Sequence, residues 1–263
     1  MRSRLRGFAH LAAAALAACW LGPHAAAGQT YEPPRTPDGK PNLQGIWQVR
    51  NTANWDLQHH AGSYKIPAGL GVVVDPPDGT IPYQAWALEQ KRANFERRLE
   101  DDPLEKCYLA GVPRTMYLPL PLQIFQTPDE VMILSEYVHT WRWIPLTDLR
   151  RYPGYESWMG DPRGRWEGDT LVVETIGFNG ETWFDHAGNF HSDALKVTER
   201  FRRTAADVLT YEAIIEDPNV FTAPWTIRMP LYLHRDRDRI LENECYLDAE
   251  EAGRPTIGRH PEE

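Results

Sequence analysis

The chain has 263 residues, with 37 acidic against 28 basic side chains and a formal net charge of −9. Nucleic acid and anionic membrane surfaces are poor partners for so acidic a chain. After the N-terminal segment, no apolar run approaches the roughly 20 residues of a transmembrane helix, so we expect no membrane span.

The N-terminal segment predicts an export signal. Arg2, Arg4 and Arg6 precede an Ala/Leu-rich run, a Gly-Pro break and a stretch of small residues, which is the order of a secretory signal peptide. We expect cleavage of residues 1–27 after Ala27, which leaves 236 residues, a formal net charge of −12 and room for one large domain. LAAC at residues 16–19 also fits the pattern before a lipid-modified cysteine. The exported protein is therefore expected to be periplasmic or secreted, with an anchor through Cys19 as the alternative.

Two cysteines, Cys107 and Cys245, remain after this cleavage. In an oxidising compartment an even pair predicts a disulfide bond. The alternative is a pair of buried free thiols.

Residues 28–122 are expected to hold an N-terminal arm, one helix and loops that pack on a barrel. Prolines and a PDG turn in the arm precede LQGIWQV, which predicts a strand, and GLGVVV at 69–74 is a short strand candidate. The run PYQAWALEQKRANFERRL has helix-forming composition, and DDP at 101–103 stops it. We therefore expect one main helix near residues 82–100.

Residues 123–250 are expected to form an antiparallel β domain, followed by a C-terminal tail at 251–263. Apolar and polar residues alternate with period two between turn sequences such as FNGE, TAAD and EDPN. The alternating segments lie near residues 123–126, 131–144, 165–176, 194–203, 208–216, 225–233 and 239–247. Successive strands without helices between them predict a mainly β fold, either a lipocalin-like barrel or a curled sandwich.

The stretch DPRGRWEGDTLVVETIGFN at 161–179 gathers charges that suit a hairpin end or a catalytic centre. Gly168 supplies the unusual backbone angles of a tight turn, and Asp169 bonds to that turn. The sequence favours the hairpin, with Arg163, Arg165 and Glu167 as its solvated end.

Strand parity places Glu199 on an apolar face. In ALKVTERFRR the positions on that face are Leu195, Val197, Glu199 and Phe201. A carboxylate in a core is costly unless it is paired or protonated. Glu199 is therefore expected either to be locked to an arginine, Arg142 or Arg200, or to be tuned for proton transfer.

The run VMILSEYVHTWRWIPL places a histidine among aromatic residues. One expected face holds Tyr137, His139, Trp141 and Trp143, and the other holds Glu136, Val138, Arg142 and Ile144. His139 could line a pocket, or it could be a core histidine bonded to a backbone carbonyl. Tryptophans such as Trp183 and Trp225 supply further flat apolar surface for a ligand, or simply fill the barrel.

A third candidate group, Asp185, His186 and His191, lies on a glycine-containing loop between strands. These residues could serve acid/base chemistry, bind a divalent metal or bond to their own turns. Their spacing matches no established metal motif, and the sequence contains no HExxH, CxxC, GxSxG, P-loop or dinucleotide fingerprint. We therefore expect no metal and no organic cofactor.

Several motifs together resemble a large family of exported bacterial proteins that mostly lack assigned chemistry. The motifs are PRTPDGKPNLQGIW, CYLAGVPR, QIFQTP, GRWEGDTLVVET, GFN, HSDALKVTERFRR and EDPNVFTAPW, and they span nearly the whole mature chain. The resemblance implies a secreted, β-rich single domain and assigns no catalytic residues. This chain has TDLRRYPGYESW at 147–158 where the family has a short DGR-x-HP turn after the HTWR strand. If that segment lines a pocket mouth, ligand preference here differs from that of the relatives.

These observations predict an exported enzyme that performs acid/base catalysis on a small, largely apolar or cyclic molecule in an aromatic-lined barrel cavity. Elimination, isomerisation or cyclisation needs only a placed carboxylate and histidine. Glu199 is expected to be the buried carboxylate, and Asp185 is expected to orient a histidine. Proton donors or acceptors are expected to be His139, His191 and His186. The cation that stabilises negative charge is expected to be Arg142 or Arg200.

Two alternatives remain. The first is an exported protein that binds a small molecule without chemistry. The second is a carbohydrate-active hydrolase in which tryptophans stack on sugar rings. It predicts an open, polar groove in place of a closed cavity.

Overall fold

The computed structural model describes residues 31–247 and residue 253. The described residues from Glu32 onward belong to one structural unit. The expected signal peptide, its alternative lipid site at Cys19 and most of the expected C-terminal tail lie outside the described residues.

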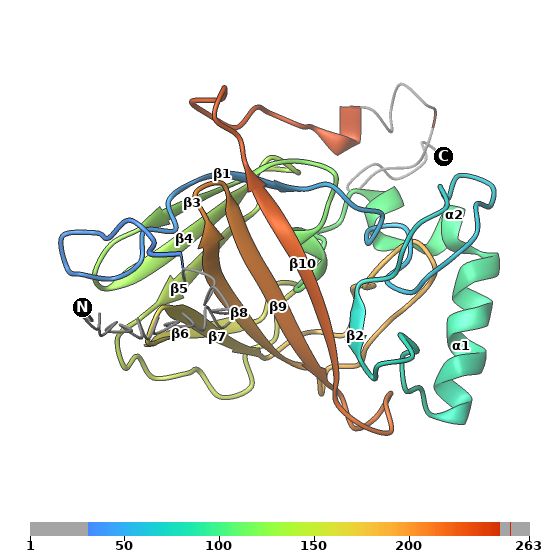
Figure 1. The fold of residues 1–263 in the computed structure, drawn as a ribbon. Coiled ribbons are helices and arrows are strands. Elements are labelled where there is room, and N and C mark those ends of the chain that lie inside the picture. The colour runs from blue at the N-terminus through green and yellow to red at the C-terminus, as the bar shows by residue number, and fades with distance from the viewer. Residues whose placement is uncertain (1–30, 248–252, 254–263) are drawn as a thin grey trace, which may run out of the picture. The chain divides into compact units, whose positions relative to one another are not determined.

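Nine antiparallel strands form a nearly closed barrel, which confirms the mainly β expectation (Figure 1). Around the barrel their order is β5-β4-β3-β1-β10-β9-β8-β7-β6, and a tenth strand, β2 (Val73–Asp75), pairs with β10 off this path. The barrel strands are β1 (Gly45–Val49), β3 (Leu122–Gln126), β4 (Glu130–Ser135), β5 (Trp141–Pro145), β6 (Asp161–Glu167), β7 (Thr170–Ile176), β8 (Lys196–Ala205), β9 (Val208–Glu216) and β10 (Trp225–Leu233). β1 comes from the N-terminal segment, so that segment contributes a strand to the barrel itself.

The barrel is open at one seam, between β5 and β6. Within residues 31–247 no ladder joins these two strands, although they lie next to each other. Gly164 of β6 marks the close approach, because a Cβ there would lie 2.6 Å from Leu146 Cδ2 and 2.9 Å from Ile144 Cγ2. Only a residue without a side chain fits so near the opposite edge.

Side chains fill the interior of the barrel. The alternation of β8, β9 and β10 turns every second residue inward, and these residues are fully buried or nearly so. Trp225, Phe201 and Tyr211 are among the largest of them, and Trp47 of β1 is fully buried as well. The lumen is therefore a packed core.

One main helix follows β2, as expected near residues 82–100, and a second helix of one turn continues it. The helices are α1 (Ala85–Glu96) and α2 (Arg98–Asp101). Asp102 then accepts the backbone N–H of Leu104 and, with Pro103, starts a short 3-10 turn. α1 lies against the 182–191 loop, where a Cβ at Gly188 would be 2.8 Å from Asn94 Cβ and from Phe95 N.

The expected hairpin at 161–179 is confirmed. β6 and β7 pair in register from Asp161 with Ile176 to Glu167 with Thr170, and Gly168 has φ +58° in the turn between them. Arg165 and Glu167 form an exposed ion pair at its end, as expected. The expectation that Arg163 belongs to this solvated end was wrong, because its side chain is largely covered by the Leu149 and Arg150 backbone and by Asp161.

The expectation of a single strand over residues 131–144 was wrong. The chain turns between β4 and β5, where Val138 and His139 have φ of 43° and 51° and Thr140 N–H bonds to the carbonyl of Tyr137. Positive φ at both central residues is the geometry of a type I′ hairpin turn, which usually needs Asn or Gly. Tyr137 and His139 therefore do not share the strand face of Trp141 and Trp143.

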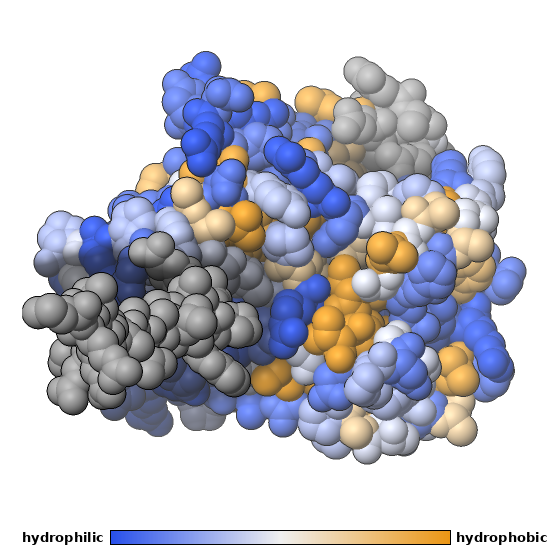
Figure 2. All heavy atoms as spheres, in the orientation of Figure 1, coloured by the Kyte–Doolittle hydropathy of each residue, from blue (hydrophilic) through white to orange (hydrophobic). Residues whose placement is uncertain are grey.

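The strand expected at 239–247 is also absent among the described residues. This segment makes one parallel bridge, between Asn243 and Tyr137, and is tied down by the disulfide Cys107–Cys245, which confirms the cysteine pairing. None of the helices of the described residues has the length and hydrophobicity of a membrane-spanning helix. Hydrophobic surface is visible near β2 in Figure 2, where Leu70 and Val74 are exposed.

Candidate functional site

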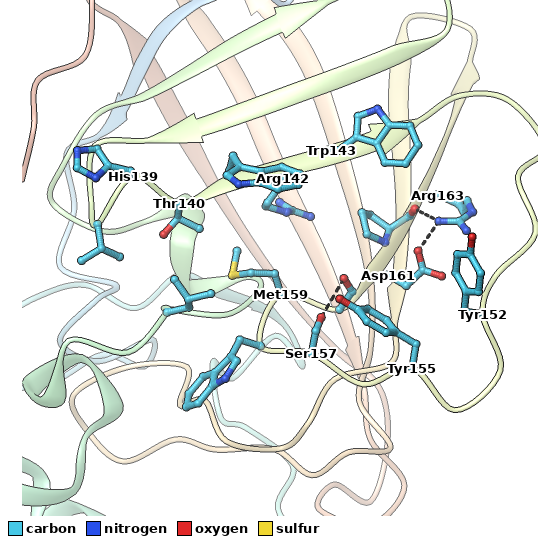
Figure 3. Close-up of a pocket in the computed structure, with 16 residues that line it drawn as sticks. His139, Thr140, Arg142, Trp143, Tyr152, Tyr155, Ser157, Met159, Asp161 and Arg163 are labelled. Carbon is cyan, nitrogen blue, oxygen red and sulfur yellow. Dashed lines mark hydrogen bonds and ion pairs between the residues drawn. The ribbon is translucent and has the colours of Figure 1, made fainter. Parts of the chain in front are cut away.

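A cavity of about 700 Å³ lies at the open seam of the barrel. Its walls come from β5, from the start of β6, from the β4–β5 turn and from residues 152–160 of the connection between β5 and β6. We call this cavity the seam groove. Figure 3 shows Arg142 and Trp143 on one side of it and Ser157, Met159 and Tyr155 on the other.

Aromatic side chains dominate the lining of the seam groove. Trp141 and Trp143 face outward on β5 because they alternate with the inward Arg142, and they are 63% and 41% exposed. Across the groove Tyr152 and Tyr155 are 81% and 56% exposed. So much exposed aromatic surface in one place makes the groove a candidate binding surface, and these fractions show that the groove is open to water.

The 147–158 segment, which the sequence singled out, supplies one wall of the groove and is fixed to the hairpin beside it. Arg163 donates through Nε to the carbonyl of Leu149 at 3.0 Å and through Nη2 to that of Arg150 at 3.2 Å, and it pairs with Asp161. Arg151 donates to the backbone carbonyl of Glu174 on β7. The wall is thus held in place by arginine–backbone hydrogen bonds.

Arg142 lines the groove from its inner side and forms an ion pair with Glu199. Arg142 Nη1 and Nη2 lie 3.0 and 2.5 Å from the two carboxylate oxygens of Glu199, and Tyr211 donates to Glu199 Oε1 at 2.9 Å. The strand parity that placed Glu199 on the core face is confirmed by its complete burial. Of the two possibilities for Glu199, the structure shows the one locked to an arginine.

His139 lies at the rim of the groove and is exposed. Its Nε2 is 3.1 Å from Glu244 Oε1, on the segment that the disulfide holds. His139 is therefore the one expected proton donor or acceptor that the structure places at the seam groove.

The other expected catalytic groups lie on the 182–191 loop, away from the lining of the groove. His191 is buried between Phe178 and Phe184. Its Nδ1 donates to the carbonyl of Ser192, so its Nε2 accepts from the hydroxyl of Thr182 at 2.6 Å. Burial lowers the pKa of His191, which favours the neutral ring. Both ring nitrogens are occupied by the two hydrogen bonds.

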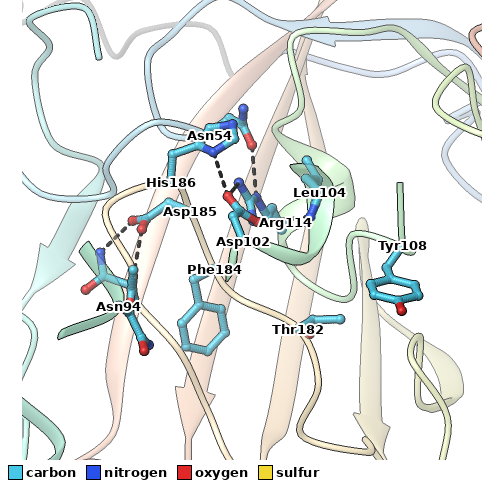
Figure 4. Close-up of polar contacts among 12 residues, drawn as sticks. Asn54, Asn94, Asp102, Leu104, Tyr108, Arg114, Thr182, Phe184, Asp185 and His186 are labelled. Atoms are coloured by element: carbon cyan, nitrogen blue, oxygen red, sulfur yellow. Dashed lines mark hydrogen bonds and ion pairs between the residues drawn. The ribbon is translucent and has the colours of Figure 1, made fainter. Parts of the chain in front are cut away.

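His186 is oriented by Asp102, not by Asp185. His186 Nδ1 lies 2.6 Å from Asp102 Oδ2, and both oxygens of Asp102 are 2.8 Å from the guanidinium of Arg114 (Figure 4). Arg114 Nε donates to Asn54 at 3.0 Å. Burial opposes the charge of Asp102, but Arg114 and His186 hold the pKa of that carboxyl well below its usual range.

Asp185 instead holds its own loop together. Its two oxygens accept the backbone N–H groups of Leu57, Ala187 and Asn189 and the side-chain amide of Asn189. Burial and the charge of Asp56 raise the pKa of Asp185 to about 7, against these hydrogen bonds. The contacts make Asp185 a structural link between the 182–191 loop and residue 57.

The remaining expected binding residues are dispersed. Trp225 is fully buried in the core against Phe184 and Phe221, and Tyr137 is buried beside Ala110 and Leu118. Glu136 pairs with Arg237, Arg200 pairs with Glu167 on the outer face, and Trp183 bridges to Phe190. None of these lines the seam groove. The described residues contain no group of three or more side chains placed to hold a metal ion.

Sequence reasoning missed several groove residues. Tyr152, Tyr155 and Trp158 lie in the 147–158 segment, which the sequence singled out as a candidate pocket mouth without assigning these residues to it. The groove can hold a flat ring between aromatic walls, and His139 offers proton transfer at its rim. Comparison with models of protein families, with curated proteins and with solved structures found no match for this chain.

Proposed function

We propose that the protein binds a small ring-containing molecule in the seam groove and does so without changing it chemically. The observation that supports this most is the set of exposed aromatic side chains on two facing walls of one cavity. A volume of about 700 Å³ lies in the range of small-molecule sites.

The positions of the ionisable groups also favour binding over catalysis. Glu199 has its oxygens occupied by Arg142 and Tyr211, and His191 has both ring nitrogens occupied. A general acid or base needs a free lone pair or proton within reach of the substrate. Neither residue offers one toward the groove.

The test is ligand-observed NMR with a library of small ring compounds, run on wild type and on two tryptophan variants. Trp143→Ala removes a groove wall, so we expect the saturation-transfer signals of the hits to disappear. Trp86→Ala is the matched control, because Trp86 is 53% exposed on α1 and does not line the groove. Hits that persist in Trp143→Ala would place binding elsewhere and reject the proposal.

A second candidate is the acid/base enzyme of lyase or isomerase type. It is favoured by one observation, the contact of His139 with Glu244 at the groove rim. A carboxylate that orients a histidine at the edge of a ring-binding groove is a common arrangement for proton transfer.

This candidate is tested by incubating each NMR hit with the protein and following its spectrum over time. Conversion that stops in His139→Gln, while binding of the hit continues, would favour the enzyme. Hits recovered unchanged from wild type favour the binding protein.

We also propose that the protein is exported and belongs to the family of exported β-rich proteins that its motifs resemble. The arginine-led N-terminal sequence and the disulfide Cys107–Cys245 support export, because disulfides persist in oxidising compartments. Sequencing the N-terminus of the exported protein would test this, with Gly28 as the expected first residue.

A further inference from the structure

We infer that the ligand of the seam groove is a neutral saccharide that stacks on Trp141 and Trp143. This inference rests on the proposed function and names the class of ligand for that site. Three features of the groove support it: its charges are internally paired, it is open to water, and the rings of Trp143 and Trp158 are held by neighbouring residues.

The charged groups of the lining all have opposite charges beside them. Arg142 is paired with Glu199, Arg163 with Asp161, and His139 contacts Glu244. A charged ligand would have to break one of these ion pairs to find an opposite charge. Otherwise it would lie in the groove with no opposite charge beside it. The groove therefore fits a neutral molecule better than a charged one.

The openness of the groove distinguishes a saccharide from an apolar ring. Sites for apolar molecules bury roughly 70–90% of the ligand surface. A ligand lying along walls that include Trp141 and Tyr152, which are 63% and 81% exposed, keeps one side in water. An apolar ring gains little from such half-burial, whereas a sugar covers one C–H face and leaves its hydroxyl groups hydrated.

The chemistry of the walls fits a sugar face. The C–H bonds of that face carry small positive charges, which are attracted to the negative face of an aromatic ring. The lining also contains Ser157, Thr140 and Asp161, whose oxygen atoms can accept hydrogen bonds from hydroxyl groups. This mixture of flat rings and short polar side chains is what a saccharide needs.

Neighbouring residues hold two of the rings, Trp143 and Trp158, in place before any ligand arrives. Trp143 Nε1 donates to the carboxylate of Glu130 on β4. Trp158 stacks on Tyr108 with ring centroids 4.8 Å apart and an angle of 25°. Fixed rings lower the entropy lost on binding, which favours a weakly stacking ligand such as a sugar.

The experiment is isothermal titration of the full exported protein with neutral hexasaccharides of cellulose, xylan, mannan, chitin and starch. A galacturonate hexasaccharide serves as the anionic probe, and N-phenyl-1-naphthylamine serves as the neutral apolar probe. We expect at least one neutral saccharide to bind. Its affinity should fall about tenfold or more in Trp141→Ala and in Trp143→Ala, and should be unchanged in Trp86→Ala.

The outcomes separate this inference from the function on which it rests. If only N-phenyl-1-naphthylamine binds, and its binding is lost in Trp143→Ala, the ring-binding groove stands and the saccharide inference is overturned. Binding of the galacturonate probe alone also overturns it. If no probe responds to the groove variants, both proposals fail. Both substitutions lie on the outer face of β5, so an unchanged melting temperature will show that the fold is intact.

Discussion

The buried pair of Arg142 and Glu199 is the residue-scale feature with the largest expected energy. We expect Glu199→Gln to lower the free energy of unfolding by roughly 3 to 5 kcal/mol, because it leaves the Arg142 guanidinium buried without its counter-charge. Urea denaturation monitored by tryptophan fluorescence will measure this. The control is Glu167→Gln, which changes an exposed pair and is expected to leave the midpoint where it is. A Glu199→Gln variant as stable as wild type would instead restore Glu199 as a candidate for proton transfer.

Asp102 should make stability depend on pH. Its pKa lies below the ordinary aspartate value near 3.9, so its ionised form stabilises the fold above about pH 4, and this contribution is lost as the pH falls further. We expect Asp102→Asn to melt well below wild type at pH 7. The difference between their melting temperatures should shrink below pH 4, because the Asp102 carboxylate of the unfolded chain takes up a proton there while that of the folded protein stays ionised. A constant difference between pH 7 and pH 3 would contradict this.

Expectations about single residues were confirmed where they depended on the alternation of side chains along one strand. The inward direction of Glu199 follows from the alternation of β8, which neighbouring apolar residues fix. The partner of His186 was not predictable, because Asp102 comes from the end of α2, 84 positions earlier in the chain. Only the fold brings such residues together, so the sequence offered the nearer Asp185 as the expected partner.

At the scale of elements, the 147–158 segment depends on Arg163 for its place beside the hairpin. We expect Arg163→Ala to release the backbone of Leu149 and Arg150 and to speed tryptic cleavage after Arg150 and Arg151. If the loss of these hydrogen bonds lowers the free energy of local opening of the segment by about 1.4 kcal/mol, cleavage becomes about tenfold faster. Arg165→Ala removes a neighbouring arginine that pairs with the exposed Glu167, so its cleavage rate should match wild type. Equal rates in both variants would show that the segment is held by other contacts.

The strands could be predicted where alternating apolar and polar residues end at a sequence that is typical of a turn. β9 and β10 have the expected bounds, and the β6–β7 turn contains the glycine that its geometry requires. The β4–β5 turn was missed because Val138 and His139 adopt positive φ without Asn or Gly. The error did not change the surface expected for His139, which lines the seam groove with Trp141 and Trp143, although it does so from a turn and not from a strand.

At the scale of the whole molecule, the disulfide fixes the segment after β10 to the segment that leads into β3. Cys107 and Cys245 are 138 residues apart, and a cross-link over so long a loop stabilises by about 2 to 5 kcal/mol. We expect a double variant, Cys107→Ser with Cys245→Ser, to unfold at lower urea concentration by this amount. Wild type in dithiothreitol should behave in the same way. If reduction changes nothing, the β domain alone determines stability.

The open seam has a mechanical consequence. No main-chain hydrogen bonds cross between β5 and β6 in the described residues, so side chains alone set the spacing of these two edges. Side-chain contacts yield more readily than a ladder, which makes the width of the seam the softest dimension of the barrel. A molecule bound there would contact both β5 and β6 and so join the two edges that no ladder connects. Its binding would therefore reduce the motion of the whole barrel.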